Sequence, residues 1–490
     1  MKRNEENIVK DGNREMVSDR RGFLKGTAWM GAVAVAAGCA SAAKRTSSGE
    51  ATMFGFAAPA LRKVRVGVVG LGERGAAAAH RLAMIPGVEV TALCDRKPAE
   101  TEKQLKWFAE HGYRAPKAFT GERDCARRMC DWDGIDLVYN CTDWISHAPI
   151  ALEAMRAGKH AFVEVPAAMT LDECWELVET SEKTRRHCMQ LENGCYGERV
   201  MTELMLVRAG VLGEITHGDC GYIHDLTEYN HNRTNGDTWR LDWDRTHTGD
   251  PYPTHGLVPL MQMMNVNRGD RFDYLVSMGS PQACYEKYER EHYPAGDRRR
   301  GSVLMPDVTT TLVKLLSGKT ITITHDVSTA RPHSVQRAVM GTGGYYSSDP
   351  NLVFLYDPAH KGTRSHKPWD EKRKDELDAK YRHPLWKVAG EIAKKVGGHG
   401  GIDFIMDLRI AYCLQNGLPL DQDVYDLASC CAVVELSDRS CRNGSSRETF
   451  PDFTRGGWKT AKPLGIVEID PKKMGLSLEK VSSDDAQLKV

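Results

Sequence analysis

The feature that most constrains the fold is a glycine-rich turn, Gly70-Leu71-Gly72-Glu73-Arg74-Gly75, set between two different kinds of sequence. Residues 63–69 alternate and then become apolar, as a buried parallel strand does, and residues 76–82 are typical of a helix. In such a turn the first glycine allows the tight bend, the second lets backbone approach a pyrophosphate, and the third lets helix pack on strand. The phosphates then lie at the N-terminus of the helix. The turn therefore predicts the opening unit of a dinucleotide-binding domain.

The acidic residue that such a domain needs follows a second strand. The apolar run 88–94 ends in Asp95, about 20 residues past the glycines, where a carboxylate takes the ribose hydroxyls. Asp95 favours NAD over NADP, because a 2′-phosphate would face a like charge. The neighbouring Arg96 leaves NADP open as an alternative.

Strands and helices continue to alternate as far as residue 193. Strands are expected at 135–142 and 160–166, and helices at 149–157 and 171–184. This alternation predicts an α/β fold with a doubly wound parallel sheet, whose ligands bind at the carboxyl ends of the strands. The positions expected to surround the cofactor are Asp95, Trp144, His147, Glu164 and Asn193.

The rest of the chain predicts a second, α+β domain with a largely antiparallel sheet and C-terminal helices. Strands 309–315 and 320–326 are joined by a short turn, and residues 402–414 and 424–437 are typical of amphipathic helices. We expect four segments: a signal and linker at 1–60, an NAD-binding Rossmann domain at 61–193, a substrate-binding domain at 194–470, and a polar tail at 471–490.

Composition excludes several classes of function. The 490 residues include 66 Lys and Arg against 66 Asp and Glu, so no basic field is available for a nucleic acid. The 14 cysteines form neither a zinc-site pattern nor a disulfide framework, and the histidines match no metal motif, so no metal is expected. The oligomeric state is not readable, and a homo-oligomer, most commonly a dimer, is the default expectation.

The N-terminus resembles a twin-arginine export signal. Arg20-Arg21 lies in the segment Ser-Asp-Arg-Arg-Gly-Phe-Leu-Lys and precedes the uncharged residues 26–43, which are too short and too rich in alanine for a membrane span. Two kinds of processing remain open for this signal: attachment of a lipid anchor to Cys39, or cleavage after Ala40-Ser41-Ala42. The protein is therefore expected in the periplasm or at the cell surface. Because this route carries folded proteins, a cofactor could be loaded before export.

The order of the motifs in the first domain resembles the oxidoreductase superfamily of glucose-fructose oxidoreductase and inositol dehydrogenase. In those enzymes the strand at 160–166 normally ends in Glu-Lys-Pro, and the lysine assists hydride transfer. Here the segment reads Glu164-Val165-Pro166. The missing lysine counts against an exported sugar dehydrogenase or oxidoreductase, which stays open as the first alternative.

A second set of motifs is more specific and spans residues 64–459. It comprises Glu164-Val165, residues 170–175, residues 192–196, residues 221–226, Trp239-Arg240, residues 252–256, His325-Asp326, Gly397-Gly398-His399-Gly400-Gly401 and Pro451-Asp452-Phe453. Together these motifs resemble glycoside hydrolase family 109, the NAD-dependent α-N-acetylgalactosaminidases.

That resemblance implies site residues, position by position. The implied NAD contacts are Gly70, Gly72, Glu73, Arg74, Gly75, Asp95, Trp144, Ile145, Ser146, His147, Glu164, Val165 and Asn193. The implied substrate contacts are Tyr222, Arg240, Tyr252, Pro253, Thr254 and His255. His399 resembles the mobile acid/base residue of the family, and Tyr252 and His255 are the other candidates for catalysis. One departure stands out: the tyrosine that follows Arg-Pro in the family is His333 here, so either His333 contacts the sugar or that contact is lost.

The implied reaction explains why these residue types are needed. Bound NAD⁺ oxidises the sugar at C-3, so that a base can remove the C-2 proton and the C-1 group can be eliminated; water then adds and the sugar is reduced again, with retention. Histidine and tyrosine suit such proton transfers near neutral pH, and the glycines beside His399 let its segment move. His224 and His325 are expected to be structural. A catalytically idle, NAD-bound sugar-binding protein remains the second alternative, and the natural glycan is not readable from the sequence.

Overall fold

The computed structural model describes residues 52–232, 238–356 and 367–475. The predicted twin-arginine signal and Cys39 lie outside the described residues. Within those three ranges, no helix combines the length and the apolar composition that a membrane span needs.

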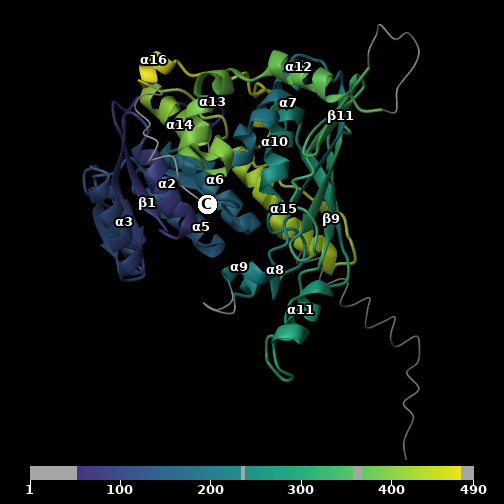
Figure 1. Cartoon of the computed structure of the whole chain (residues 1–490), viewed down its shortest axis with the longest axis horizontal. Helices are drawn as coiled ribbons and strands as arrows, with labels where there is room; N and C mark the ends of the chain where they lie inside the picture. The colour runs from purple at the N-terminus through teal and green to yellow at the C-terminus, as the bar shows by residue number, and fades with distance from the viewer. Residues whose placement is uncertain (1–51, 233–237, 357–366, 476–490) are drawn as a thin grey trace, which may run out of the picture. The chain divides into compact units, whose positions relative to one another are not determined.

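The first domain is a six-stranded parallel sheet in which helices connect successive strands (Figure 1). The strand order is β3-β2-β1-β4-β5-β6, and every neighbouring pair is parallel. Its elements are β1 (Val64–Val69), α2 (Glu73–Ala83), β2 (Val88–Asp95), α3 (Pro98–Glu110), β3 (Lys117–Thr120), α4 (Cys125–Cys130), β4 (Leu137–Asn140), α5 (Trp144–Arg156), β5 (His160–Val163), α6 (Leu171–Thr184) and β6 (Cys188–Gln190). The predicted doubly wound α/β architecture is confirmed.

The central strands are buried on both faces, which is why their sequences are almost wholly apolar. Every residue of β4 and β5 is buried, as helices covering both faces of a parallel sheet require. One helix begins earlier than predicted: α5 starts at Trp144, because the Asp143 carboxylate accepts the N–H of Ser146 at 3.0 Å and caps the helix. Pro149, the predicted start, lies inside that helix.

The second domain is built on an eight-stranded mixed sheet of order β13-β12-β11-β7-β10-β9-β8-β14. All neighbouring pairs are antiparallel except β7 with β10, so the predicted largely antiparallel sheet is confirmed. Its strands are β7 (Ile215–Ile223), β8 (Phe272–Gly279), β9 (Thr309–Leu315), β10 (Thr320–Asp326), β11 (Ala338–Gly341), β12 (Gly344–Ser348), β13 (Asn351–Leu355) and β14 (Glu448–Thr449).

Helices pack against one face of this sheet and lie between it and the first domain. They are η1 (Asn193–Tyr196), α7 (Glu198–Arg208), α8 (Thr227–Asn230), α9 (Trp239–Asp244), α10 (Thr254–Met264), α11 (Cys284–His292), α12 (Glu371–Tyr381), α13 (Pro384–Val396), η2 (His399–Gly401), α14 (Ile402–Asn416), α15 (Val424–Arg442), η3 (Gly457–Lys459) and α16 (Pro471–Met474). Helices α10 and α15 lie against the second sheet (Figure 1), and α14 contacts β1 and α2 of the first. Helix α14 therefore brings late residues of the chain next to the glycine turn.

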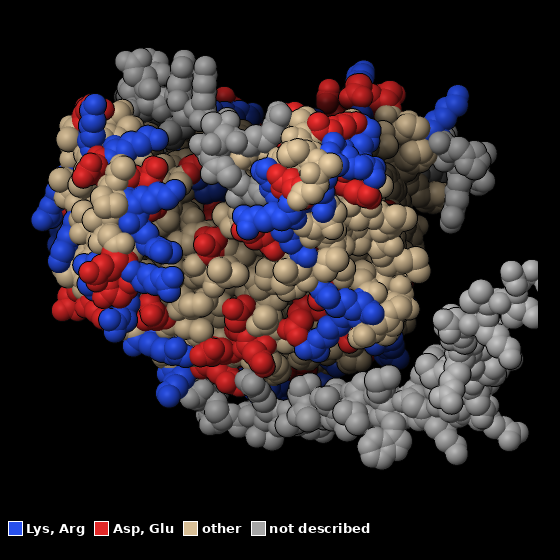
Figure 2. Space-filling view, turned by 90° about the horizontal axis from the view of Figure 1, so that it is seen from below, with Lys and Arg blue, Asp and Glu red and all other residues tan. Residues whose placement is uncertain are grey.

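The packed chain extends past both predicted boundaries of the core. The linker expected from the sequence includes residues 52–60, but Met53 and Ala58 are buried. The Met53 N–H also donates to the Tyr425 hydroxyl at 3.2 Å. At the other end Met474, in the predicted polar tail, is also buried. On the face seen in Figure 2, positive and negative side chains are interspersed with uncharged ones.

Candidate active site

The glycine turn between β1 and α2 has the close backbone approaches that its sequence predicts. Gly70 has a φ of 81°, and a Cβ there would lie 2.7 Å from the carbonyl oxygen of Cys141. A Cβ on Gly75 would lie 1.8 Å from the carbonyl oxygen of Gly70, whereas a Cβ on Gly72 would meet nothing within 4 Å. Gly70 and Gly75 are therefore required by the fold, and Gly72 leaves open space at the start of α2.

The groups around Gly72 fit a dinucleotide. Gly72 is the N-cap of α2 and supplies no side-chain cap, so the positive end of the helix dipole is not neutralised by a capping side chain. Asp95, at the end of β2, accepts the N–H of Leu71 at 2.7 Å and the N–H of Lys97 at 2.8 Å. These bonds hold the carboxylate beside the turn, where it can take a ribose hydroxyl.

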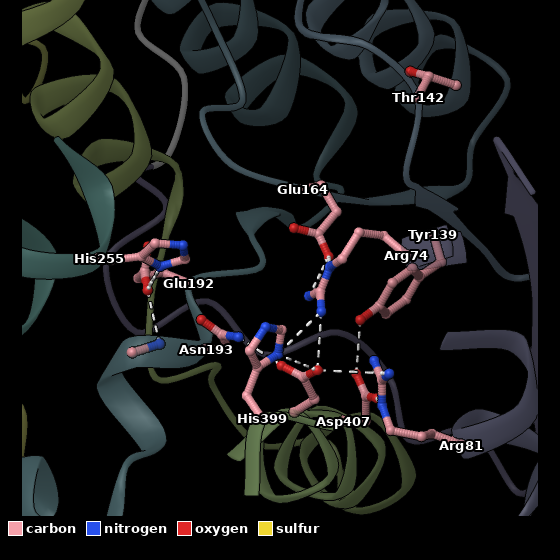
Figure 3. Close-up of polar contacts among 12 residues, drawn as sticks. Arg74, Arg81, Tyr139, Thr142, Glu164, Glu192, Asn193, His255, His399 and Asp407 are labelled. Carbon is pink, nitrogen blue, oxygen red and sulfur yellow. Dashed lines mark hydrogen bonds and ion pairs between the residues drawn. The ribbon is translucent and has the colours of Figure 1, made fainter. Parts of the chain in front are cut away.

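Arg74, in the first turn of α2, joins three parts of the chain. Its Nη2 donates to Glu164 Oε1 at 2.7 Å (Figure 3). Its Nη1 donates to Asp403 Oδ2 at 3.0 Å. The same Nη1 lies 3.2 Å from Nδ1 of His399. The sequence predicts that Arg74 and Glu164 contact the cofactor. In the structure these two side chains bind each other, and Arg74 connects the end of β5 to Asp403 of α14.

Asp403 is the residue on which these contacts converge. Its side chain is fully buried; Oδ1 accepts the Asn193 amide at 2.6 Å, and Oδ2 lies 3.0 Å from His399 Nδ1. Burial acts to raise the pKa of Asp403, but His399, Arg81 and Arg74 together hold it well below its usual range. Asp403 is therefore an anion that links a predicted cofactor residue to the predicted acid/base histidine.

A second buried carboxylate completes the network one helical turn later. Asp407 accepts from Arg81 Nε at 3.0 Å and from the Tyr139 hydroxyl at 2.8 Å (Figure 3). Arg81 also lies 3.6 Å from Asp403 Oδ2, so one guanidinium serves both carboxylates. Burial raises the pKa of Asp407 to about 6 even though Arg81 acts in the opposite direction. These contacts pin α14 to α2 and β4.

The loop that carries His399 is built almost entirely from residues in the left-handed region. Gly397, Gly398, Gly400 and Gly401 all have positive φ, and His399 itself has a φ of 45°. Side chains disfavour this region, so the four glycines allow a conformation that other residues would resist. The His399 side chain is 46% exposed while its Asp403 partner is buried, so the ring is held at one nitrogen and open to solvent elsewhere.

His255 has a buried carboxylate partner of its own. It lies in the first turn of α10, and its Nδ1 is 2.8 Å from Oε1 of the fully buried Glu192 (Figure 3). Oε2 of Glu192 has no hydrogen-bond partner among the described residues, and Oε1 also accepts the N–H of Gly194 at 2.7 Å. Arg337 donates to the backbone oxygen of His255 at 2.9 Å. Both the ring and the backbone of His255 are therefore held in place.

Aromatic rings and Arg240 form one wall of the site. The rings of Tyr222 and Tyr252 are 4.6 Å apart, and the Tyr222 ring is 5.8 Å from that of His255. The Arg240 guanidinium lies 4.9 Å from the Tyr252 ring and 5.2 Å from the Trp144 ring. Burial raises the pKa of both tyrosines, although Arg240 acts to lower it. Both tyrosines are therefore neutral hydrogen-bonding groups at rest.

Val165 belongs to the same wall. It is buried in an apolar cluster with Trp144, Met169, Tyr252 and Val434. Where the resemblance to dehydrogenases leads one to expect a lysine, Val165 has no polar side-chain atom that could move a proton.

The other predicted residues lie in varied surroundings. The ring of His147 is buried, with Nδ1 2.7 Å from the carbonyl oxygen of Pro166 and Nε2 3.0 Å from that of Thr142. Both ring nitrogens therefore contact the backbone. Ile145 is 67% exposed, and Thr254 is fully buried. His333 is exposed, and its ring lies 4.9 Å from that of His224.

His224 was expected to be structural, yet its Nδ1 lies 3.4 Å from the hydroxyl of Tyr222. That contact places His224 beside a predicted substrate residue. Glu73 is exposed, the Ser146 N–H donates to the Asp143 cap of α5, and Pro253 is the buried N-cap of α10. Among the described residues, no group of three or more His, Cys, Asp or Glu side chains is arranged to hold a metal ion.

Sequence reasoning missed the buried partners of the two histidines. Asp403 and Asp407 lie at helical spacing in a segment whose only other charged residue is Arg409, and Arg81 follows Arg74 by two helical turns. Buried charges in an apolar helix are rarely tolerated unless they are paired, so the pattern was an available signal. Glu192 lies in the motif at residues 192–196, but nothing in the sequence indicates its contact with His255.

The fold and the glycine turn define a protein with an NAD-binding Rossmann domain. Residues 64–191 match the family model described as oxidoreductase family, NAD-binding Rossmann fold. A levoglucosan dehydrogenase solved with NADH and levoglucosan aligns with a TM-score of 0.61 at 18% identity, covering 80% of this chain and 100% of the other. An aldose-aldose oxidoreductase from Caulobacter crescentus aligns with a TM-score of 0.55 at 19% identity, covering 79% of this chain and 100% of the other. These structures share the fold.

The second domain makes the assignment specific. Residues 196–460 match the model of the glycosyl hydrolase 109 C-terminal domain. A glycosyl hydrolase family 109 protein of Shewanella woodyi is 43% identical over 429 residues, or 86% of this chain and 91% of that protein. A Shewanella oneidensis protein named alpha-N-acetylgalactosaminidase is 42% identical over 459 residues, or 91% of this chain and 98% of that protein. The chain belongs to glycoside hydrolase family 109.

Proposed function

We propose that this protein is an exported glycosidase that removes terminal α-linked N-acetylgalactosamine with retention, using NAD that stays bound through turnover. Near full-length similarity to a relative named alpha-N-acetylgalactosaminidase supports the substrate. The observation that carries the mechanism is a single hydrogen-bonded network that contains Arg74 of the glycine turn and His399 of the glycine loop. Such a network couples a cofactor site to a group suited to proton transfer.

NAD⁺, when bound, supplies reversible oxidation at C-3 of the sugar, which makes the C-2 proton acidic. Gly70, Gly72 and Gly75 would shape its phosphate site, and Asp95 would accept hydrogen bonds from its ribose hydroxyls. The remaining tasks are to orient the sugar and to move protons. Arg240 presents a cation between two aromatic rings and suits the polar groups of a sugar.

Two histidines and a tyrosine are available for the proton transfers. Nδ1–H of His255 donates to Glu192 at 2.8 Å, which leaves Nε2 as the nitrogen that can accept a proton. His399 is held in the same way by Asp403, on a loop whose glycines permit movement. Tyr252, kept neutral by burial, can hydrogen-bond to a sugar oxygen. We assign proton removal to His255. We assign protonation of the departing oxygen to His399, after its Nε2 has taken up a proton from solvent.

The apolar surroundings of Val165 favour this reaction over a plain sugar dehydrogenase. A closed redox cycle leaves no reduced cofactor to be exchanged, and a protein outside the cytoplasm has no NAD pool from which to replace it. The twin-arginine segment at Arg20-Arg21 supports loading of the cofactor before export, to the periplasm or the cell surface.

One assay tests the proposal. Purified protein is incubated in deuterated water with a chromogenic α-N-acetylgalactosaminide, and product release, absorbance of NADH and deuterium at C-2 of the product are measured. We expect release of the chromophore without net NADH and with deuterium at C-2. Cleavage without label at C-2 would refute the elimination mechanism.

The alternatives give different results in the same assay. Net NADH without cleavage would indicate a dehydrogenase. Bound NAD and sugar with neither reaction would indicate a binding protein. Arrested export after replacement of Arg20-Arg21 by Lys-Lys is the separate expectation for the signal, and unchanged export would refute that part.

A further inference from the structure

The carboxylate of Asp403 has a position that its role in packing alone does not explain. We propose that Asp403 is a positioning residue for His399: it holds one ring proton on Nδ1, so that Nε2 faces the glycoside oxygen, takes up a second proton from solvent and donates it to the departing oxygen. This inference rests on the proposed function, in which His399 protonates the departing oxygen.

The local fold brings the two side chains together over one helical turn. The loop closes on itself through the Gly401 N–H, which donates to the Gly398 oxygen at 2.8 Å, and α14 begins at the next residue. Asp403 lies in the first turn of α14, four residues after His399, and its Oδ2 is 3.0 Å from Nδ1 of the ring. The histidine is thus anchored by the helix that follows its loop.

The contact distances decide where the proton lies. A carboxylate oxygen has only lone pairs, so a bare Nδ1 at 3.0 Å would place two lone pairs against each other. A proton on Nδ1 turns this contact into a charge-assisted hydrogen bond. Arg74 Nη1 is farther from Nδ1, at 3.2 Å, and already donates to Asp403 at 3.0 Å. The arrangement therefore favours the Nδ1–H form, with Nε2 free to exchange a proton.

The remaining partners keep Asp403 charged and immobile. Arg74 and Arg81 place two cations at Oδ2, at 3.0 and 3.6 Å, and Asn193 donates to Oδ1 at 2.6 Å. A buried carboxylate with this many donors has few other positions available. Asp407, one turn later, shares Arg81 with Asp403 and accepts hydrogen bonds from Arg81 and Tyr139, so it offers a matched control.

The test compares Asp403→Asn with Asp407→Asn on two substrates that differ in the leaving group. A 4-nitrophenyl glycoside needs little protonation to depart, and a methyl glycoside needs a great deal. General acid assistance is worth about 10²–10⁴-fold. We expect Asp403→Asn to lower kcat on the methyl glycoside by about 100-fold and on the nitrophenyl glycoside by less than about tenfold. We expect Asp407→Asn to lower both equally.

Equal losses on the two substrates for Asp403→Asn would assign the residue to packing only and overturn the proposal. A double variant with His399→Gln should lose no more than His399→Gln alone, because the two residues act as one unit. Additive losses would count against the proposal in the same way. Retained NAD, measured in each purified variant, shows that the cofactor site survives the substitution.

A measurement on the unmodified protein covers the case in which Asp403→Asn does not fold. Nitrogen NMR of ¹⁵N-histidine-labelled protein, compared with His399→Gln, identifies the His399 ring and its protonated nitrogen. The neutral ring should carry its proton on Nδ1, and a proton on Nε2 would overturn the proposal. If the unmodified protein cleaves neither glycoside, the proposed function fails, while the position of the ring proton still decides what Asp403 does.

Discussion

The glycine turn allows a prediction that separates cofactor binding from folding. Gly72→Ala places a methyl group where no atom of the protein lies within 4 Å, at an extended backbone conformation with φ −65° and ψ −164°. Gly75→Ala, three residues later, places the same methyl group 1.8 Å from the carbonyl oxygen of Gly70. The two variants add the same methyl group, which meets open space at Gly72 and backbone at Gly75.

The expected magnitudes follow from that difference. Gly72→Ala should change the stability of the cofactor-free protein by about 1 kcal/mol or less, since an alanine is compatible with this conformation. It should weaken NAD⁺ binding by about 1–3 kcal/mol, or about 5- to 150-fold, because the methyl group separates backbone from phosphate. Gly75→Ala should instead destabilise the protein itself by about 3 kcal/mol or more, because the backbone of the turn must move.

Two measurements check the pair. Urea unfolding of the cofactor-free proteins gives stability, and calorimetric titration with NAD⁺ gives affinity. Gly72→Ala with the affinity of the unmodified protein would refute the assignment of that open space to the pyrophosphate. Gly75→Ala with unchanged stability would refute the close packing of α2 on the turn.

Three further outcomes are expected. His399→Ala should abolish turnover of a glycoside while leaving NAD in the purified protein, and full activity would remove His399 from the mechanism. Glu192→Gln should lower kcat by about tenfold or more, because His255 loses its charged partner; unchanged kcat would show that this pair is only structural. Burial raises the pKa of Glu203 from 4.5 to about 8, although Arg337 acts to lower it. Between these two pH values the folded state holds a proton that the unfolded chain has lost, so stability falls as pH rises. Glu203→Gln should therefore stabilise the protein more at pH 8 than at pH 5 in urea unfolding, and an equal effect at both would contradict the raised pKa.

Local patterns in the sequence are enough to predict much of the first domain. The turn at 70–75 and the acid at 95 follow strands recognisable by composition, and each depends on neighbours in the chain. The start of α5 was misplaced because the proline at 149 is a strong breaker signal, while capping by Asp143 is a weaker one that prevailed. Family motifs then supplied His399, Tyr252 and the other candidate residues.

The buried carboxylates that contact the arginine and histidine side chains of the site could not be predicted from local patterns. Asp403 meets Arg74 across 329 positions of sequence, and Glu192 meets His255 across 63. Neither separation corresponds to the period of a helix or strand, so no local pattern encodes it.

The sequence by itself determined a dinucleotide-binding α/β domain, the family and the residues that bear chemistry, because these depend on side-chain type and short-range spacing. The tertiary structure alone decided which charges neutralise one another. Packing of α14 on α2 buries Asp403 between two arginines, and this burial converts an ordinary acidic residue into the anchor of His399.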